Sequence, residues 1–190
     1  MQNNSVTTHL KLICVVLLGI FYLQRAVMKK LLFLDFDGVL HSEECDKYFT
    51  KLTLFELYLK KLPEVEIVIS SSWRELHSLT ELKQFFSESL RDRIVGVTPI
   101  LDCGCDRGGR QREIEAFLSE NNLNEDNAAW IALDDISVYF DKSCTYLIKV
   151  DPGSGFSNKE GQALFDWYKQ TTFIARMKAV AQSGRQQFSF

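Results

Sequence analysis

The chain has 190 residues, of which 46% are hydrophobic and 25% are charged, and its formal net charge is -3. This composition excludes wholesale disorder and is sufficient for one domain with a substantial core. The small negative charge argues against tight, non-specific binding of nucleic acid, but it leaves room for a local basic cleft that accepts a nucleic-acid end.

The N-terminal extension, residues 1–27, contains an apolar run over residues 12–23. A helix needs roughly 20 apolar residues to cross a bilayer, so this run is too short. Arg25, Lys29 and Lys30 follow the run whereas only Lys11 precedes it closely, and no small-residue cleavage site follows, which argues against a signal peptide. The same charges fit an anchor with its basic end in the cytoplasm. The five cysteines are irregularly spaced, which fits a reducing compartment. We expect a cytoplasmic protein whose true start is Met28 or whose first residues form a helix on the domain. A membrane anchor through 12–23 is the alternative.

The rest of the chain alternates short apolar segments with amphipathic ones, which predicts strands alternating with helices. Strands are expected over residues 30–34, 65–69, 94–97, 129–133 and 146–150. Helices are expected over residues 52–62, 76–86 and 114–118, and a last helix is expected to begin at an Asn158 cap. The pattern predicts an α/β domain over residues 28–170 with a doubly wound parallel sheet, followed by a polar tail over 171–190.

Polar side chains follow three of the expected strands, at the points where those strands end. They are the pairs Asp35 and Asp37, Ser70 and Ser71, and Asp134 and Asp135. Carboxylates and hydroxyls are costly to bury, so their repetition after strands indicates a site rather than packing. Parallel strands bring their carboxyl ends to one edge of the sheet, where we expect an acidic basin.

The acidic residues also predict a metal site. Asp35 and Asp37 are two positions apart, so a regular strand would point both carboxylates to one face. Such neighbours repel each other unless a cation neutralises them or one carries a proton. Asp134 or Asp135 from a neighbouring strand would complete an all-oxygen site, which suits Mg²⁺ better than Ca²⁺. Gly38 allows the backbone to turn close to a ligand.

The segment Asp35-Phe-Asp-Gly-Val resembles the first motif, DxDGx, of the haloacid dehalogenase (HAD)-like superfamily of phosphotransferases. The resemblance implies a HAD-like Rossmannoid fold and a phosphatase. Asp35 would attack phosphorus and form an aspartyl-phosphate, and Asp37 would protonate the leaving oxygen and then activate water. Mg²⁺ would be the cofactor, bound by the Asp35 side chain, the Asp37 backbone carbonyl, and Asp134 with Asp135 as its alternative.

The other motifs of the superfamily occur in order. The resemblance implies that Ser70 binds a phosphoryl oxygen and that Ser71 adds a donor. The third motif is a basic residue near a helix start, for which Arg110 is the choice and Arg107 and Arg112 are the alternatives. The family more often has Lys at this position. An Arg would clamp phosphate through two nitrogens, although Arg-rich helix starts can also be ordinary solvated surface.

A closer resemblance covers Met28 to about Gln170. The strings LDFDGVLH, ISSSWRE, RxREIxxFL and IALDD, followed by DPxxGF, are similar to the HAD domain of Swiss Army Knife RNA-repair proteins. In that family Trp73 and Arg74 would extend the second motif. Arg74 would contact substrate phosphate or pair with an acidic neighbour, and His41 would contact substrate or be an ordinary loop residue.

The intervals from Asp37 to Ser70 and from Ser70 to Arg110 are too short for the lid domain that many family members carry. An uncapped cleft favours a phosphate at the end of a polymer, and the loop over 102–109 is the element expected to touch it. We expect a Mg²⁺-dependent phosphomonoesterase that acts on a polynucleotide end. The alternatives are a small-molecule phosphatase whose lid comes from a partner subunit, and a catalytically silent domain that binds a phosphorylated partner.

Overall fold

The computed structural model of the protein describes residues 28–44, 46–102 and 106–186, with side chains up to residue 180. The expectations for residues 1–27, including the apolar run over 12–23, therefore lie outside the described residues. Among the described helices, none is both long enough and apolar enough to cross a membrane.

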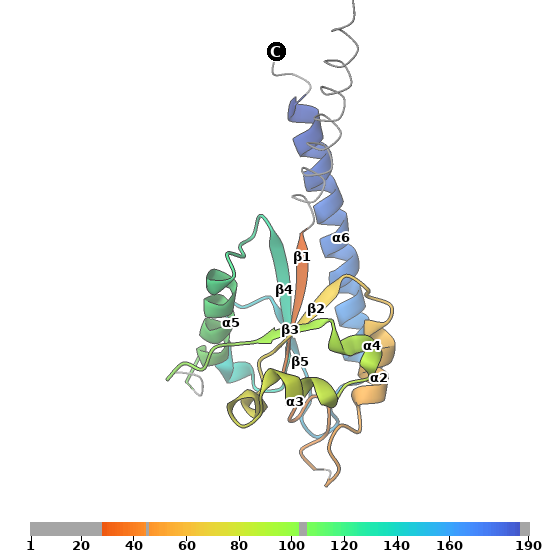
Figure 1. Cartoon of the computed structure of the whole chain (residues 1–190), viewed down its shortest axis with the longest axis vertical. Coiled ribbons are helices and arrows are strands. Elements are labelled where there is room, and N and C mark those ends of the chain that lie inside the picture. Colours follow the sequence, from red (N-terminus) through yellow and green to blue (C-terminus); the bar gives the residue numbers. More distant parts are fainter. Residues whose placement is uncertain (1–27, 45, 103–105, 187–190) are drawn as a thin grey trace, which may run out of the picture. The chain divides into compact units, whose positions relative to one another are not determined.

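The described strands form one parallel sheet in the order β3-β2-β1-β4-β5, with β1 in the middle (Figure 1). They are β1 (Lys29–Leu34), β2 (Val65–Ile69), β3 (Ile94–Val97), β4 (Ala128–Asp134) and β5 (Leu147–Lys149). Each end lies within one residue of its predicted position. Strand length and apolar content were therefore reliable signals here, as expected for strands that are buried on both faces.

Helices cover both faces of the sheet, which confirms the doubly wound α/β fold (Figure 1). On one face lie α2 (Leu52–Leu59), α3 (Leu79–Gln84), α4 (Glu88–Arg91) and the beginning of α6 (Asn158–Gln186). On the other face lies α5 (Gly109–Glu120). The residues of β1 alternate between these layers: Leu32 and Leu34 belong to the first hydrophobic cluster, and Leu31 and Phe33 to the second.

Two short 3₁₀ helices, η1 (Ser72–Glu75) and η2 (Ser137–Tyr139), follow β2 and β4 at the carboxyl edge. The chain leaves β1 toward the face of α2, whereas it leaves β4 toward the face of α5. Neighbouring strands whose connections depart to opposite faces open a crevice between their carboxyl ends, and this is where doubly wound sheets bind ligands. The fold thus positions a candidate site between β1 and β4.

The helix predicted over residues 76–86 is shorter in the structure, where α3 covers Leu79–Gln84 and the next helix, α4, begins at Glu88. α3 begins after Ser78, which forms a capping box with Glu81: the Ser78 hydroxyl accepts from the Glu81 N–H, and the Glu81 carboxylate accepts from the Ser78 N–H. This cap sets the helix start later than the apolar spacing indicates. As a result, Leu76 precedes the helix and is 84% exposed.

The last helix also differs from the prediction at both ends. Ser157, rather than Asn158, is the capping residue, because its hydroxyl accepts from the Lys159 N–H and its own N–H donates to Glu160. α6 then continues to Gln186, through the segment predicted as a tail. That segment has no proline and is rich in good helix formers, so nothing in its backbone chemistry ends the helix earlier.

Candidate active site

The register of the sheet brings the polar residues of three strands together. Leu34, the last residue of β1, pairs with the last residue of β2 and with Leu133 of β4. The Asp35 N–H donates to the Leu133 carbonyl over 3.1 Å, and the Ser70 N–H donates to the Leu34 carbonyl over 3.0 Å. Asp35, Ser70 and Asp134 are therefore neighbours at the carboxyl edge, which is the placement that the strand pattern indicates.

Three buried carboxylates form a cluster at this edge. One oxygen each from Asp35, Asp134 and Asp135 lies within 4.8 Å of the others. Burial and the charge of Asp35 raise the pKa of Asp134 to about 8 and the pKa of Asp135 to about 6. These are hard oxygen ligands whose mutual repulsion a divalent cation would relieve, so the residues present fit a Mg²⁺ ion.

Arg110, at the start of α5, lies beside this cluster. Its Nη1 is 3.4 Å from Asp35 Oδ2 and 3.2 Å from Asp134 Oδ2, and its Nε is 3.7 Å from Glu113 Oε2. Burial alone would lower the pKa of Arg110, but the three carboxylates outweigh it and raise the pKa. Arg110 is thus a permanent positive charge next to Asp35, positioned where a phosphoryl oxygen could take the place of a carboxylate.

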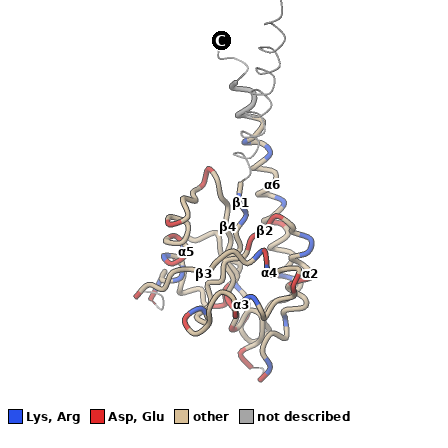
Figure 2. Tube along the Cα trace, in the orientation of Figure 1, with Lys and Arg blue, Asp and Glu red and all other residues tan. Residues whose placement is uncertain are grey.

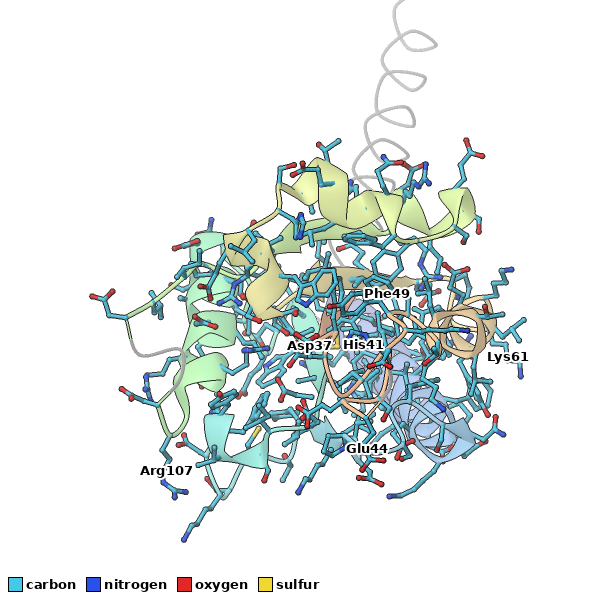
Figure 3. The ribbon with its side chains drawn as sticks, turned by 90° about the horizontal axis from the view of Figure 1, so that it is seen from below. Asp37, His41, Glu44, Phe49, Lys61 and Arg107 are labelled. Atoms are coloured by element: carbon cyan, nitrogen blue, oxygen red, sulfur yellow. The ribbon has the colours of Figure 1, made fainter. Side chains whose placement is uncertain are left out.

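The other two arginines considered for phosphate binding do not lie beside the carboxylate cluster. Arg107 is exposed and points away from Asp37 (Figure 3). Arg112 is also exposed, and its Nη1 donates to the Arg107 carbonyl over 2.9 Å. Of the three arginines considered, the structure brings Arg110 to the acidic cluster.

Asp37 lies past the end of β1 and has different neighbours from Asp35. Its Oδ1 is 3.0 Å from His41 Nε2, and its Oδ2 accepts from the Trp73 indole N–H over 2.9 Å. The regular-strand geometry assumed for the pair does not apply, because the strand ends at Leu34. The Asp37 side chain is 46% exposed and is not part of the carboxylate cluster. Any contribution of Asp37 to a metal site would therefore come from its backbone, as the resemblance implies.

His41 is buried beside Asp37, as Figure 3 shows. Its Nδ1 is buried and has no hydrogen-bond partner. A proton on Nδ1 would be unsatisfied, so of the two tautomers the one with its proton on Nε2 fits the geometry, and Nε2 then donates to Asp37. His41 and Trp73 together fix the orientation of the Asp37 carboxylate. The sequence analysis named both residues but did not predict this role.

The two serines that follow β2 are buried at the edge of the site. Ser70 is 1% exposed, and Ser71 caps η1 by accepting from the Trp73 N–H over 3.4 Å. Both lie outside the residues that line the central cavity described below. Their proposed contact with phosphate therefore rests on the motif rather than on the geometry.

Arg74 pairs with an acidic neighbour, one of the two alternatives considered for it. Its Nη2 is 2.6 Å from Glu113 Oε2, and it donates to the backbone carbonyls of Ser70, Ser71 and Thr98. Burial lowers the pKa of Arg74, and the charge of Glu113 opposes this shift. Through these contacts Arg74 connects the segment that follows β2 with the segment that follows β3 and with α5. Its contacts in the structure therefore indicate a structural role.

Glu113 is the site residue that the sequence analysis missed. Its side chain is 2% exposed and faces two arginines, Arg74 and Arg110. The residue is part of the string RxREIxxFL, but only the folded α5 shows that it faces inward toward an arginine 39 positions earlier in the chain.

We expect Glu113→Gln to lower the free energy of unfolding by about 3–5 kcal/mol, because it leaves two buried guanidinium groups short of a counter-charge. Denaturant unfolding of the variant would measure this loss. Glu115→Gln, an exposed site on the same helix, is the matched control and is expected to cost less than about 0.5 kcal/mol. Equal stability of the two variants would contradict the role given to Glu113.

Gly38 lies directly against the carboxylate cluster. Its φ is +65°, and a Cβ at this position would be 2.6 Å from Asp135 Cγ. We expect Gly38→Ala to cost roughly 1–3 kcal/mol through backbone strain and to displace Asp135. Denaturant unfolding and a calorimetric Mg²⁺ titration would measure the two effects. Gly153→Ala is the control, because its Cβ would be 3.4 Å from the nearest atom. Unchanged stability and Mg²⁺ affinity in Gly38→Ala would contradict the close packing.

A cavity of about 520 Å³ opens over the cluster. Asp35, Asp37, Arg110 and Asp135 line it together with Asp102, the described beginning of the loop predicted to touch substrate. Residues 103–105 of that loop lie outside the described part. The cavity brings together the Asp35 and Asp37 carboxylates and the Arg110 guanidinium, and it borders the carboxylate cluster that fits Mg²⁺. Phosphoryl transfer uses groups of these kinds.

The segments around this cavity contain no large insertion in the described chain. Only α2 lies between β1 and β2, and only η1, α3, α4 and β3 lie between β2 and α5. The described part of the chain is therefore a doubly wound parallel sheet without a large cap domain, as predicted.

Comparison with known families agrees with this architecture. The family model described as "HAD domain in Swiss Army Knife RNA repair proteins" matches residues 31–160. Searches of the curated proteins and of the solved structures found no match. The matched region contains the carboxylate cluster, Arg110 and Asp37, and HAD-like domains of this kind are phosphatase-type hydrolases. The chain therefore belongs to the family of HAD domains found in Swiss Army Knife RNA repair proteins.

Proposed function

We propose that the protein is a Mg²⁺-dependent phosphomonoesterase that works through an aspartyl-phosphate on Asp35. The observation that carries this proposal is the convergence of Asp35, Asp135 and Arg110 on one cavity at the switch point of the sheet. Asp134 is buried beside them, in the same carboxylate cluster and 3.2 Å from Arg110 Nη1. Transfer of a phosphoryl group requires mainly alignment and neutralisation of charge, and these groups supply both.

Asp35 is suited to be the nucleophile because its carboxylate is fixed. Its Oδ1 accepts from the Phe36 N–H over 2.8 Å, and its Oδ2 lies 3.4 Å from Arg110 Nη1. In the proposed reaction an Asp35 oxygen attacks phosphorus, and the bond from phosphorus to the leaving oxygen breaks. Arg110 binds a non-bridging oxygen of the same phosphoryl group.

Asp37 is the proposed general acid and base. It lines the same cavity as Asp35, and its orientation is set by Trp73 and His41. Asp37 protonates the leaving oxygen in the first step. In the second step it takes a proton from the water that hydrolyses the aspartyl-phosphate, which returns both residues to their starting state.

Asp35, Asp134 and Asp135 would hold Mg²⁺, together with the Asp37 backbone carbonyl that the family resemblance implies. The bound cation would neutralise negative charge on the phosphoryl group. Within the protein, Arg110 already shares this task, because it contacts both Asp35 and Asp134.

A polynucleotide end is the proposed substrate. The family description names RNA repair proteins, and the described chain has no cap domain over the cavity. Figure 2 shows Lys and Arg interspersed with Asp and Glu in the described chain, so a long basic track along the surface is not part of the argument. A small-molecule phosphatase is the second candidate, favoured by the acidic residues around the cavity. The silent-domain alternative is disfavoured by the intact Asp35 and Asp37.

The test is a phosphatase screen with Mg²⁺ and, in parallel, with a chelator. The substrates are 3′- and 5′-phosphorylated oligonucleotides, common phosphorylated metabolites and acetyl phosphate, which is activated and has no bulky leaving group. We expect turnover with Mg²⁺ and loss of turnover with the chelator. Hydrolysis that is insensitive to the chelator would contradict the metal dependence. Absence of any hydrolysis would favour the silent domain.

A further inference from the structure

Exposed apolar side chains gather beside Asp37, outside the central cavity. Tyr48 is 66% exposed and Leu76 is 84% exposed, and neither contributes to the core. Single exposed apolar residues are common and need no explanation. These two, however, line one cavity of about 500 Å³ together with Asp37, Trp73 and His77. We call the part of this cavity lined by Tyr48, Trp73, Leu76 and His77 the ring pocket.

The ring pocket adjoins the central cavity at the proposed general acid. Asp37, Ser72 and Glu75 line both cavities. A general acid must lie next to the oxygen that it protonates, so the leaving group of the substrate has to begin at Asp37. With phosphorus at Asp35 in the central cavity, the ring pocket lies where that leaving group would extend. The inference therefore rests on the proposed function.

The aromatic side chains of the ring pocket are held by other rings. The Trp73 ring centroid lies 5.4 Å from that of Tyr48 and 5.7 Å from that of His77. Behind them, Trp73 packs against Phe36, Phe49 and Phe85. Its indole N–H is already used by Asp37. Such a supported cluster offers aromatic surfaces in fixed positions, which suits a planar ring that stacks.

The charges around the ring pocket limit what it can accept. Glu43, Asp46 and Glu75 line the cavities on the Asp37 side. Among the described residues that line the ring pocket and its two neighbouring cavities, the arginines are Arg74 and Arg110, and both are buried in ion pairs. Additional phosphates would be repelled here, whereas an uncharged group would not.

We propose that the ring pocket binds the base of a single nucleoside, which is the leaving group of the phosphomonoester. Ser72 and Glu75, at the junction of the two cavities, offer polar partners to the sugar that joins phosphate and base. The nucleoside comes from a free mononucleotide or from the terminal residue of a strand whose other phosphates lead away from Glu43 and Asp46.

The test compares substrates that differ only in the base. Full-length protein with Mg²⁺ hydrolyses adenosine 5′-monophosphate or ribose 5-phosphate, and kcat/KM is measured for each. We expect the wild type to prefer the nucleotide. Tyr48→Ala is expected to lower the ratio of the two kcat/KM values by roughly 5- to 150-fold, the range for loss of one stacking contact. Leu76→Ser, which removes an apolar contact with the base, is expected to lower the same ratio by a smaller factor.

The controls are two exposed apolar residues of the same types at other places. Tyr146 is 47% exposed and directly precedes β5, an edge strand of the sheet, and Leu57 is 52% exposed on α2. Tyr146→Ala and Leu57→Ser are expected to leave the ratio unchanged. All four sites are exposed, so folding is not expected to decide the result, and a melting curve of each variant would verify this.

Acetyl phosphate separates failure of the inference from failure of the proposed function. Suppose that acetyl phosphate is hydrolysed but kcat/KM is about the same for adenosine 5′-monophosphate and ribose 5-phosphate; the ring-pocket inference alone is then overturned. The same holds if Tyr48→Ala and Leu76→Ser leave the ratio of these two kcat/KM values unchanged. A preference for phosphotyrosine over adenosine 5′-monophosphate would also overturn it. No hydrolysis of acetyl phosphate would overturn both. If the inference is correct, a phosphorylated decanucleotide distinguishes the two sources: the same dependence on Tyr48 indicates a strand end, and much slower hydrolysis indicates a free nucleotide.

Discussion

Asp35→Asn is expected to lower kcat/KM for any phosphomonoester by at least about 10⁴-fold, because it removes the proposed nucleophile. Asparagine has nearly the same shape and keeps an oxygen that can accept from the Phe36 N–H. It removes one negative charge from a cluster in which the carboxylates repel each other. Arg110 loses Asp35 as a counter-charge but keeps Asp134 and Glu113, which offsets this relief of repulsion. The metal-free variant should therefore fold about as stably as the wild type, and loss of activity would not come from unfolding.

Three measurements together decide this prediction. Steady-state kinetics give the loss of turnover, and thermal unfolding in a chelator gives the stability. Mass spectrometry of acid-quenched wild type during turnover should locate a phosphoryl group on the peptide that contains Asp35. Asp92→Asn, an exposed aspartate at the end of α4, is the control and is expected to change none of them. Retention of more than about one hundredth of wild-type activity in Asp35→Asn would exclude Asp35 as the nucleophile.

The main features of the fold were predictable because local chemistry and tertiary structure agree along most of the chain. The five strands are short apolar segments bounded by polar residues, and burial on both faces of a parallel sheet makes such segments easy to identify. The apolar spacing failed at Leu76, because the spacing alone does not show that the Ser78 capping box starts the helix three residues later, at Leu79. The prediction from composition was also wrong for the second half of α6, where a polar segment was interpreted as a tail although its residues favour helix.

The candidate site was predictable only in part, for a related reason. Residues at strand ends, such as Asp35 and Asp134, are positioned by sheet register, and the sequence shows where strands end. Residues that join different elements are positioned by tertiary packing, which the sequence does not show. The contacts of Glu113 with Arg74 and of Trp73 with Asp37 are of this kind.

Asp134→Asn is expected to remove Mg²⁺-dependent activity and to change how stability depends on pH. In the metal-free protein the pKa of Asp134 is raised from an ordinary 3.8 to about 8, because of burial and the charge of Asp35. Below about pH 4 the carboxyl is protonated in the folded and unfolded states alike. Between about pH 4 and pH 8 the unfolded chain releases this proton first, so the unfolding free energy of the metal-free protein falls as the pH rises. Asparagine has no proton to release, so the unfolding free energy of metal-free Asp134→Asn should decrease less as the pH rises.

Mg²⁺ should reverse this trend in the wild type, because a bound cation favours the ionised carboxylates of Asp35, Asp134 and Asp135. At about 100 times its Kd the ion would stabilise the fold by about 2.7 kcal/mol. This increase in unfolding free energy on adding Mg²⁺ should be largest near pH 8 and smallest near pH 5, where protons compete with the ion for Asp134 and Asp135. Asp134→Asn should lose most of this gain.

Thermal unfolding at about pH 5 and pH 8, with Mg²⁺ and with a chelator, measures both effects in one series. A metal-free wild type that becomes more stable from pH 5 to pH 8 relative to Asp134→Asn would show that the pKa of Asp134 is not raised. An Asp134→Asn protein that gains as much from Mg²⁺ as the wild type would place the ion elsewhere. The predicted pattern has a physical meaning for the site: the repulsion among its buried carboxylates, which makes the metal-free protein less stable, is the same interaction that favours binding of a divalent cation beside Asp35.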